Sequence, residues 1–292
     1  MNLPRGIISV LQTPFTTDGG LDAASLVKLI ETAICEGVNG FPAPVVASEV
    51  DYLSRSEREA IIRLVVDTVK GRVPFIVGAS SLDMAECRHF ARLAGQSRAA
   101  AYLVAVPPAL YSRPDEIPTF FQAVSANVAL PLIIQDLEWN GPGLSLATLS
   151  RLKELVPTLA GVKIETVPAG PKYTAVRRAF GDGFFIAGGW AVPQMLEPLD
   201  REVDASIPES SMVAVYSAIC RAHGSGDRAG AFRIFRQLIP VLAFTNQEIG
   251  VSIAFFERLL ERKGILQSAT MRQPWTGWDD YNSRISDELI EL

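Results

Sequence analysis

Short apolar runs rich in β-branched residues alternate along the chain with segments in which apolar residues recur at helical spacing. Leu26, Leu29, Ile30 and Ala33 illustrate the second pattern, because they fall on one face of a helix. The first pattern is typical of buried strands. Runs of this kind predict strands at 7–13, 38–45, 73–80, 100–107, 130–136, 160–166, 184–190 and 203–209.

Eight alternating strand and helix units are typical of a (β/α)8 barrel. A doubly wound sheet alternates in the same way, but no GxGxxG or GxxxxGK[ST] segment follows any of the runs. The absence of these glycine loops also argues against a nucleotide cofactor. Helix starts are marked by the capping-box sequence at 54–57 and by Ser145. We therefore predict an α/β fold, a (β/α)8 TIM barrel with additional C-terminal helices.

The pattern becomes continuously helical from about residue 210 onward. This is more helix than the last barrel unit needs. We predict a barrel over residues 1–225 and a helical extension packed on it over 226–292. Such additional helices are expected to pack against a neighbouring chain.

Composition narrows the possible partners. The net charge is −5, and no dense patch of Lys and Arg appears, which argues against nucleic acid or an anionic membrane as the main partner. The chain has no run of 18 apolar residues, and its first residues do not resemble a signal peptide. We expect a cytoplasmic protein.

Cysteine and histidine offer little chemistry in this chain. Cys35, Cys87 and Cys220 lie far apart and form no CxxC pair, so neither a disulfide framework nor a zinc site is expected. The only histidines, His89 and His223, lie in or at the ends of helical segments. A Ser-His-Asp triad or a multi-histidine metal centre is therefore not expected, and no metal ligands are assigned.

Lys163 interrupts the apolar run AGVKIET, whereas the other five lysines fall in helical or loop segments. Strand alternation places Lys163 and Glu165 on the face that looks into a barrel, near the carboxyl end of the strand. Burial lowers the pKa of a lysine, and the resulting free amine can form a Schiff base with a carbonyl. A structural ion pair between the two side chains explains the same pattern, so both roles stay open.

The chain resembles the dihydrodipicolinate synthase and N-acetylneuraminate lyase family of class I aldolases. The similarity rests on GIISVLQTPFTTDGGLD near the start, EVDYLSRSER after the second strand and GVKIE on the sixth. It implies that Lys163 is the covalent Schiff-base residue. It also implies a homotetramer or homodimer and a 2-keto acid substrate. No organic cofactor is needed, because the iminium accepts the electrons.

Several positions depart from the family pattern. The family's GTTGE loop is VVASE here, so its threonine is replaced by Val46. The strand-five tyrosine is replaced by Gln135, and an arginine found in some members by Asn140. Tyr111 resembles a tyrosine that members lend across a subunit interface. IIQD, VKIE and the segment from FTNQEIG to MRQP are together similar to the 2-keto-3-deoxy-pentonate dehydratase branch, which includes the L-2-keto-3-deoxyarabonate enzyme.

The resemblance predicts a lyase that dehydrates a 2-keto-3-deoxy sugar acid. Lys163 would form the Schiff base and Glu165 would be the base, with Gln135 and Tyr111 binding substrate. Further substrate contacts are expected from backbone and side chains around the second and seventh strands: Val46, Ala47, Ser48, Gly188 and Gly189. One alternative is retro-aldol cleavage to pyruvate and an aldehyde, which Trp139 and Trp190 favour by shaping a larger pocket. The other is a non-catalytic barrel that binds keto acids.

Overall fold

The computed structural model describes residues 3–189 and 194–292. Its parallel strands form one sheet in the order β1-β8-β7-β6-β5-β4-β3-β2. Backbone hydrogen bonds from Ser9 to Gly40 and from Asn39 to Ile7 join β1 to the segment before β2 and close the ring. The predicted barrel is therefore confirmed. The strands are β1 (Gly6–Ile7), β2 (Phe41–Ala43), β3 (Phe75–Gly78), β4 (Ala101–Ala105), β5 (Leu132–Leu137), β6 (Leu159–Glu165), β7 (Phe185–Gly188) and β8 (Ala205–Ser206).

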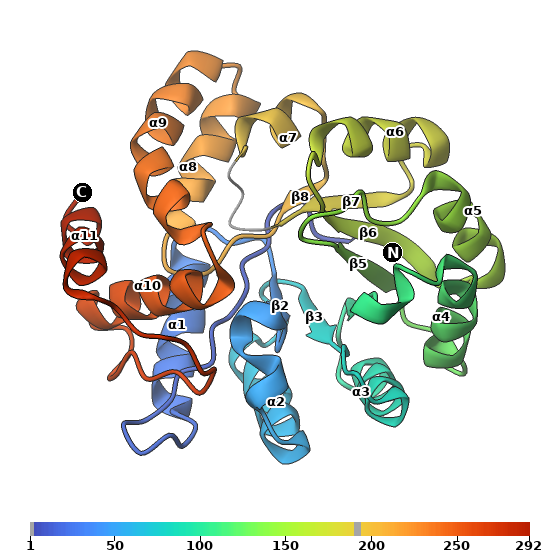
Figure 1. Ribbon diagram of the computed structural model, residues 1–292, viewed down its shortest axis with the longest axis horizontal. Helices are drawn as coiled ribbons and strands as arrows, with labels where there is room; N and C mark the ends of the chain where they lie inside the picture. Colours follow the sequence, from blue (N-terminus) through green and yellow to red (C-terminus); the bar gives the residue numbers. More distant parts are fainter. Residues whose placement is uncertain (1–2, 190–193) are drawn as a thin grey trace.

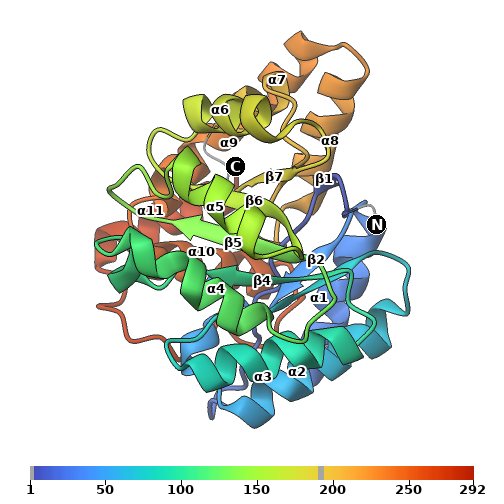
Figure 2. The same cartoon turned by 90° about the vertical axis from the view of Figure 1, so that its right-hand side faces the viewer.

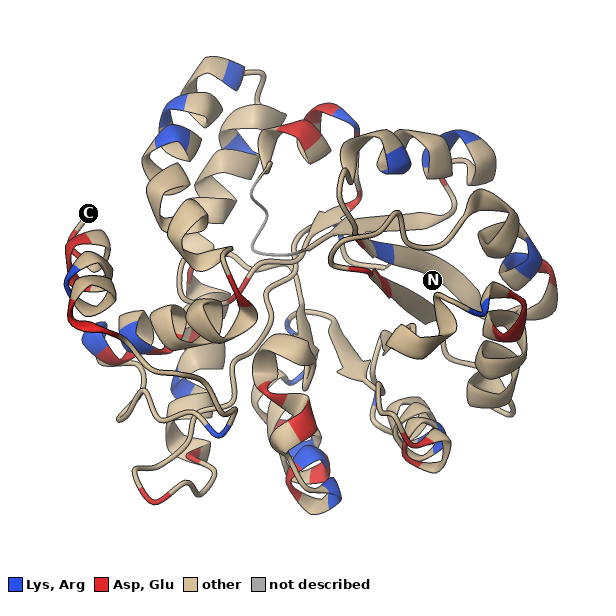
Figure 3. Cartoon of the chain, in the orientation of Figure 1, with Lys and Arg blue, Asp and Glu red and all other residues tan. Residues whose placement is uncertain are grey.

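Helices surround the strands, as seen in Figure 1 and, from the side, in Figure 2. The barrel helices are α1 (Ala23–Cys35), α2 (Arg55–Val69), α3 (Met84–Gln96), α4 (Ile117–Ser125), α5 (Leu146–Leu155), α6 (Gly170–Phe180), α7 (Leu196–Asp200) and α8 (Val213–Gly224). The end of the chain adds α9 (Arg228–Thr245), α10 (Ile249–Arg262) and α11 (Asp280–Ile290). Charges of both signs lie on α2, α10 and α11, whereas α6, α8 and α9 carry only Lys and Arg (Figure 3).

Two of the helix starts follow directly from local sequence. The Ser54 hydroxyl accepts a hydrogen bond from the amide of Glu57, whose carboxylate accepts one from the Ser54 amide, which completes the predicted capping box at α2. Ser145 caps α5 by accepting from the Thr148 amide. Both helix starts are confirmed.

The barrel has two apolar layers. One cluster fills the interior with inward side chains such as Ile76, Leu103 and Ile133, and a larger one lies between the strands and the helices. Val162 and Ile164 of β6 belong to the outer layer, so Lys163 on the same strand faces inward, as alternation predicted. The predicted first and last strands are too long. Beyond β1, pairing continues only as single bridges, from Ile8 to Gly40 and from Val10 to Glu209.

The additional helices gather on one side of the barrel, at the left of Figure 1. The division at 225/226 falls in the turn between α8 and α9 and stays a prediction. Across residues 3–189 and 194–292, no helix combines the length and apolar character that crossing a bilayer requires.

Candidate active site

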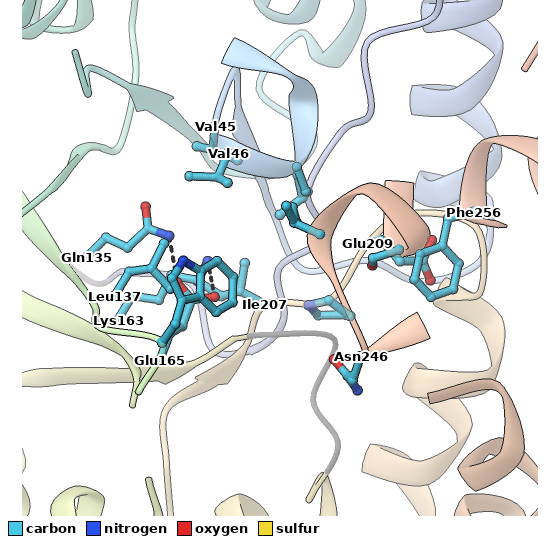
Figure 4. A pocket seen from close by; sticks show the side chains of 16 residues that line it. Val45, Val46, Gln135, Leu137, Lys163, Glu165, Ile207, Glu209, Asn246 and Phe256 are labelled. Carbon is cyan, nitrogen blue, oxygen red and sulfur yellow. Dashed lines mark hydrogen bonds and ion pairs between the residues drawn. The ribbon is translucent and has the colours of Figure 1, made fainter. Parts of the chain in front are cut away.

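The candidate site lies on the inward faces of β5 and β6, where Gln135 and Lys163 are direct partners in the strand register. The Lys163 ammonium lies 2.9 Å from Oε1 of Glu165, and both side chains are 6% exposed. Gln135 donates from Nε2 to Oε2 of the same carboxylate at 2.6 Å. Figure 4 shows the three side chains meeting at one wall of a pocket.

Gly189, just beyond β7, provides the space for this pair. A Cβ atom there would lie 2.2 Å from Oε1 of Glu165 and 2.5 Å from Cε of Lys163, which is too close for carbon contacts. Gly188 faces the other way, and a Cβ atom there would lie 2.6 Å from the Tyr173 hydroxyl oxygen. Of the two glycines proposed from sequence, only Gly189 borders the lysine.

The cavity beside Lys163 is small, with a volume of about 60 Å³. Its walls combine β5, β6, the loop after β2, the end of β8 and the start of α10. The lining residues are Val10, Val45, Val46, Ala47, Gln135, Leu137, Trp139, Lys163, Glu165, Ile207, Pro208, Glu209, Asn246, Ile249, Ser252 and Phe256. Trp190, expected at the rim, lies outside the described residues.

The loop after β2 presents backbone rather than hydroxyl chemistry to the pocket. Val46 and Ala47 line it, and Val46–Ser48 form a single 3-10 turn. The Ser48 hydroxyl is already engaged, because it donates to the carbonyl of Leu11 and accepts from the amide of Val45. Ser48 therefore holds the loop in place, and the structure does not bring its side chain into the pocket.

Glu49 braces the same loop from behind. Its Oε2 accepts hydrogen bonds from the amides of Arg272 and Gln273, in the segment between α10 and α11. Arg272 itself makes a two-point ion pair with Glu57 at the start of α2. The C-terminal segment thus ties down the loop that carries Val46 and Ala47.

Tyr111 follows β4 in the chain and reaches the outer face of β5. Its hydroxyl donates to Oδ1 of Asp136 at 3.0 Å, and it is not among the residues that line the Lys163 pocket. Burial raises the pKa of Tyr111, and the nearby charge of Asp136 raises it further. The Tyr111 hydroxyl therefore stays protonated and donates its hydrogen bond to Asp136 within this chain.

Glu209 is a pocket residue that the sequence reasoning missed. Its carboxylate accepts hydrogen bonds from the Tyr216 hydroxyl at 3.0 Å and from Gln12 Nε2 at 3.3 Å. Burial raises its pKa. Alternation along the predicted eighth strand puts Glu209 on the same inward face as Ala205 and Ile207. This alternation is the sequence signal that could have identified Glu209 as a pocket residue. The pocket residues from α10 had no comparable local signal.

The described residues contain no group of three or more His, Cys, Asp or Glu side chains placed to hold a metal ion. The chemistry of the pocket rests on an amine, two carboxylates and two amides, contributed by Lys163, Glu165, Glu209, Gln135 and Asn246. An amine held against a carboxylate in a mostly apolar barrel is an arrangement suited to carbonyl chemistry.

Residues 3–290 match the dihydrodipicolinate synthetase family, and the chain belongs to it. Members are lyases of the class I type, which form a Schiff base on a lysine, so this chain is an enzyme of that class. The resemblance seen in its sequence is confirmed.

Individual relatives span nearly the whole chain. It is 28% identical to the L-2-keto-3-deoxyarabonate dehydratase of Azospirillum brasilense, over 92% of this chain and 88% of that protein. It is 32% identical to a 4-hydroxy-tetrahydrodipicolinate synthase of Rhodopseudomonas palustris, over 85% and 83%. A crystal structure of dihydrodipicolinate synthase from Rhodopseudomonas palustris superposes with a TM-score of 0.89 at 22% identity, over 99% and 97%, which supports the fold.

Proposed function

We propose that this enzyme dehydrates a 2-keto-3-deoxy sugar acid through a Schiff base on Lys163. The observation that carries the proposal is the buried contact of the Lys163 ammonium with Glu165 on the pocket wall. A base beside the amine is what Schiff-base chemistry requires for proton transfer. Similarity to a keto-deoxy acid dehydratase supports the choice of reaction.

The reaction begins when the Lys163 amine, after losing its proton, attacks the C2 carbonyl and expels water to form an iminium. Glu165 removes a proton from C3, and the C–H electron pair forms the enamine. The enamine electrons then break the C4–O bond, and the departing hydroxide takes up a proton to leave as water. Hydrolysis of the conjugated iminium releases the product and restores the amine, so the net change is the loss of one water from the substrate.

The substrate carboxylate is placed at the loop after β2. The amides of Val46 and Ala47 begin a 3-10 turn, so they have no carbonyl partner within that turn. Backbone donors in this position stabilise an anion without adding charge. Gly189 has no side chain and so leaves the space that Lys163 and Glu165 occupy.

Dehydration is preferred over retro-aldol cleavage because of the groups around Lys163. Retro-aldol cleavage needs a base for the C4 hydroxyl, and no tyrosine is among the described residues that line the pocket. Gln135, which stands at the position of the family tyrosine, cannot carry a proton. Trp139 in the pocket wall favours retro-aldol cleavage of a longer substrate as the second candidate.

Borohydride trapping tests the proposal directly. We would incubate the enzyme with pyruvate or with each of several 2-keto-3-deoxy sugar acids, reduce it, and measure intact mass. The expected result is an adduct in the native protein and in Lys28→Ala, a control at an exposed helical lysine, and none in Lys163→Ala. Product analysis by NMR then separates loss of water from formation of pyruvate.

Two results would contradict the proposal. An adduct that persists in Lys163→Ala would place the covalent chemistry on another residue. Pyruvate as the main product from every sugar acid would replace dehydration by retro-aldol cleavage.

We also propose that the enzyme acts in the cytoplasm as a homodimer or homotetramer. Phe232 and Ile239 on α9 support assembly, because these large apolar side chains are 48% and 42% exposed in the single chain. Light scattering that gives the mass of one chain would contradict this assignment.

A further inference from the structure

Gln135 carries a buried acceptor that nothing in the described chain satisfies. The side chain is 2% exposed and lines the Lys163 pocket, and its Oε1 accepts no hydrogen bond from residues 3–189 or 194–292. Buried polar atoms in folded proteins almost always have a partner. This atom therefore indicates a hydrogen bond that a ligand completes.

The orientation of the amide is set by its neighbour. The Gln135 amide approaches Oε2 of Glu165 at 2.6 Å, and a carboxylate oxygen only accepts hydrogen bonds. The nitrogen must therefore face Glu165, and the oxygen must point away. Figure 4 shows this arrangement, with the oxygen on the side of Val45 and Val46.

The remaining walls leave the acceptor to a ligand. Trp139, Asn246 and Ser252 line the same pocket and carry donors, but none of them donates to this oxygen. The side chains of the other neighbours are apolar: Val10, Val45, Val46, Leu137 and Ile207. Lys163 is already paired with Glu165. An acceptor in this position needs a donor, which a substrate hydroxyl supplies and a keto oxygen does not.

We propose that Gln135 determines specificity by accepting a hydrogen bond from the C4 hydroxyl of the substrate. This inference rests on the proposed function, because it takes C2 to lie at Lys163 and C3 at Glu165. Contacts connect the three side chains in the order Lys163, Glu165, Gln135. That order matches C2, C3 and C4 of a 2-keto acid, so the hydroxyl that leaves is also the one that Gln135 recognises.

The test compares two acids that differ only in this hydroxyl: 4-hydroxy-2-oxopentanoate, both enantiomers, and 2-oxopentanoate. Binding is measured by ligand-observed NMR titration in a Lys163→Ala background, which cannot form the Schiff base. We expect one enantiomer of the hydroxy acid to bind about tenfold more tightly than 2-oxopentanoate. Adding Gln135→Met should reduce this preference to about twofold or less.

Gln122→Met in the same background is the matched control, because Gln122 lies exposed on α4, and it should keep the full preference. An unchanged preference in Gln135→Met, equal binding of the two acids before that change, or no binding of either acid would each overturn the inference. The amine is absent throughout, so these outcomes are independent of borohydride trapping, which tests the Schiff base separately.

Discussion

Strands β5 and β6 separate two lysine–carboxylate pairs that differ in what surrounds their carboxylates. Inside the barrel, Lys163 meets Glu165 at the edge of a cavity. On the outer face, Lys172 meets Asp136, which is 0% exposed and also accepts hydrogen bonds from the Tyr111 hydroxyl and the Leu144 amide. The two pairs lie on opposite faces of the sheet, because Gln135 points inward and the next residue of β5, Asp136, points outward.

Under the proposed mechanism, this difference separates a structural ion pair from one that takes part in the reaction. The oxygens of Asp136 accept from Tyr111 after β4, Leu144 before α5 and Lys172 on α6. Together with β5, this side chain therefore links four segments of the barrel. Glu165 instead borders space that a substrate can enter. Burial and an opposite charge alone do not identify a catalytic group; access to a cavity must be added.

The sharpest test of this contrast is Glu165→Gln. The amide keeps the size of the side chain but cannot take a proton, so kcat should fall by about 10²- to 10⁴-fold while pyruvate is still trapped on Lys163. Steady-state kinetics and intact mass after borohydride reduction provide the measurements. Glu154→Gln, at an exposed position on α5, is the control. A change in kcat below about threefold would make Glu165 a structural partner like Asp136.

Lys172→Met should show the opposite effect. Removing one partner leaves the Asp136 charge buried, which should lower the free energy of unfolding by about 3 kcal/mol, while kcat of the folded enzyme changes little. Urea unfolding measures the first quantity, and Lys28→Met is the control. If kcat falls tenfold or more without a loss of stability, Lys172 and Asp136 take part in the reaction, and the distinction between the two pairs is wrong.

Tyr111→Phe refines the assignment of the outer face. The variant loses one hydrogen bond to Asp136, so the free energy of unfolding should decrease by about 1 kcal/mol. Because the hydroxyl does not reach the Lys163 pocket, kcat should stay within about threefold of the native value. A loss of kcat that is restored when the variant assembles with native subunits would instead show that Tyr111 acts in a neighbour's site.

The smallest expected effect comes from Glu57 and Arg272, a pair at the protein surface. Arg272 lowers the pKa of Glu57 from 4.5 to about 2. The carboxylate therefore stabilises the folded state fully above pH 4.5, and this contribution is lost as the pH falls toward about 2. The effect should be about 1 kcal/mol or less because solvent screens the pair. Urea unfolding from pH 6 to pH 3 of native protein and Glu57→Gln measures it; identical pH slopes would contradict it.

Much of the fold was predictable because its signals are local. Period-2 and period-3.6 patterns located the strands and helices, and parity along one strand predicted that Lys163 and Glu165 share the inner face. The first and last strands were predicted too long, since their apolar runs continue into segments that make only isolated bridges. Apolar character marks burial, but ladder pairing depends on neighbours that are distant in sequence.

The site was less predictable for the same reason. The alternation of residues along a strand cannot reveal that the Ser48 hydroxyl forms hydrogen bonds with the backbone of Leu11 and Val45. Nor can it reveal that the Tyr111 hydroxyl donates to Asp136. Ile249, Ser252 and Phe256 reach the pocket from α10, far along the chain from the lysine strand. Such contacts depend on the tertiary packing of helices rather than on any motif.

Gly189 has a consequence for anyone who wishes to redesign this enzyme. An alanine at this position would displace the ends of the Glu165 and Lys163 side chains, so libraries that must keep this pair in place should leave Gly189 unchanged. Val46, Gln135 and Trp139 line the Lys163 pocket itself and are the better sites for variation. A residue with no side chain thus constrains redesign, because the positions of Lys163 and Glu165 depend on the space it leaves.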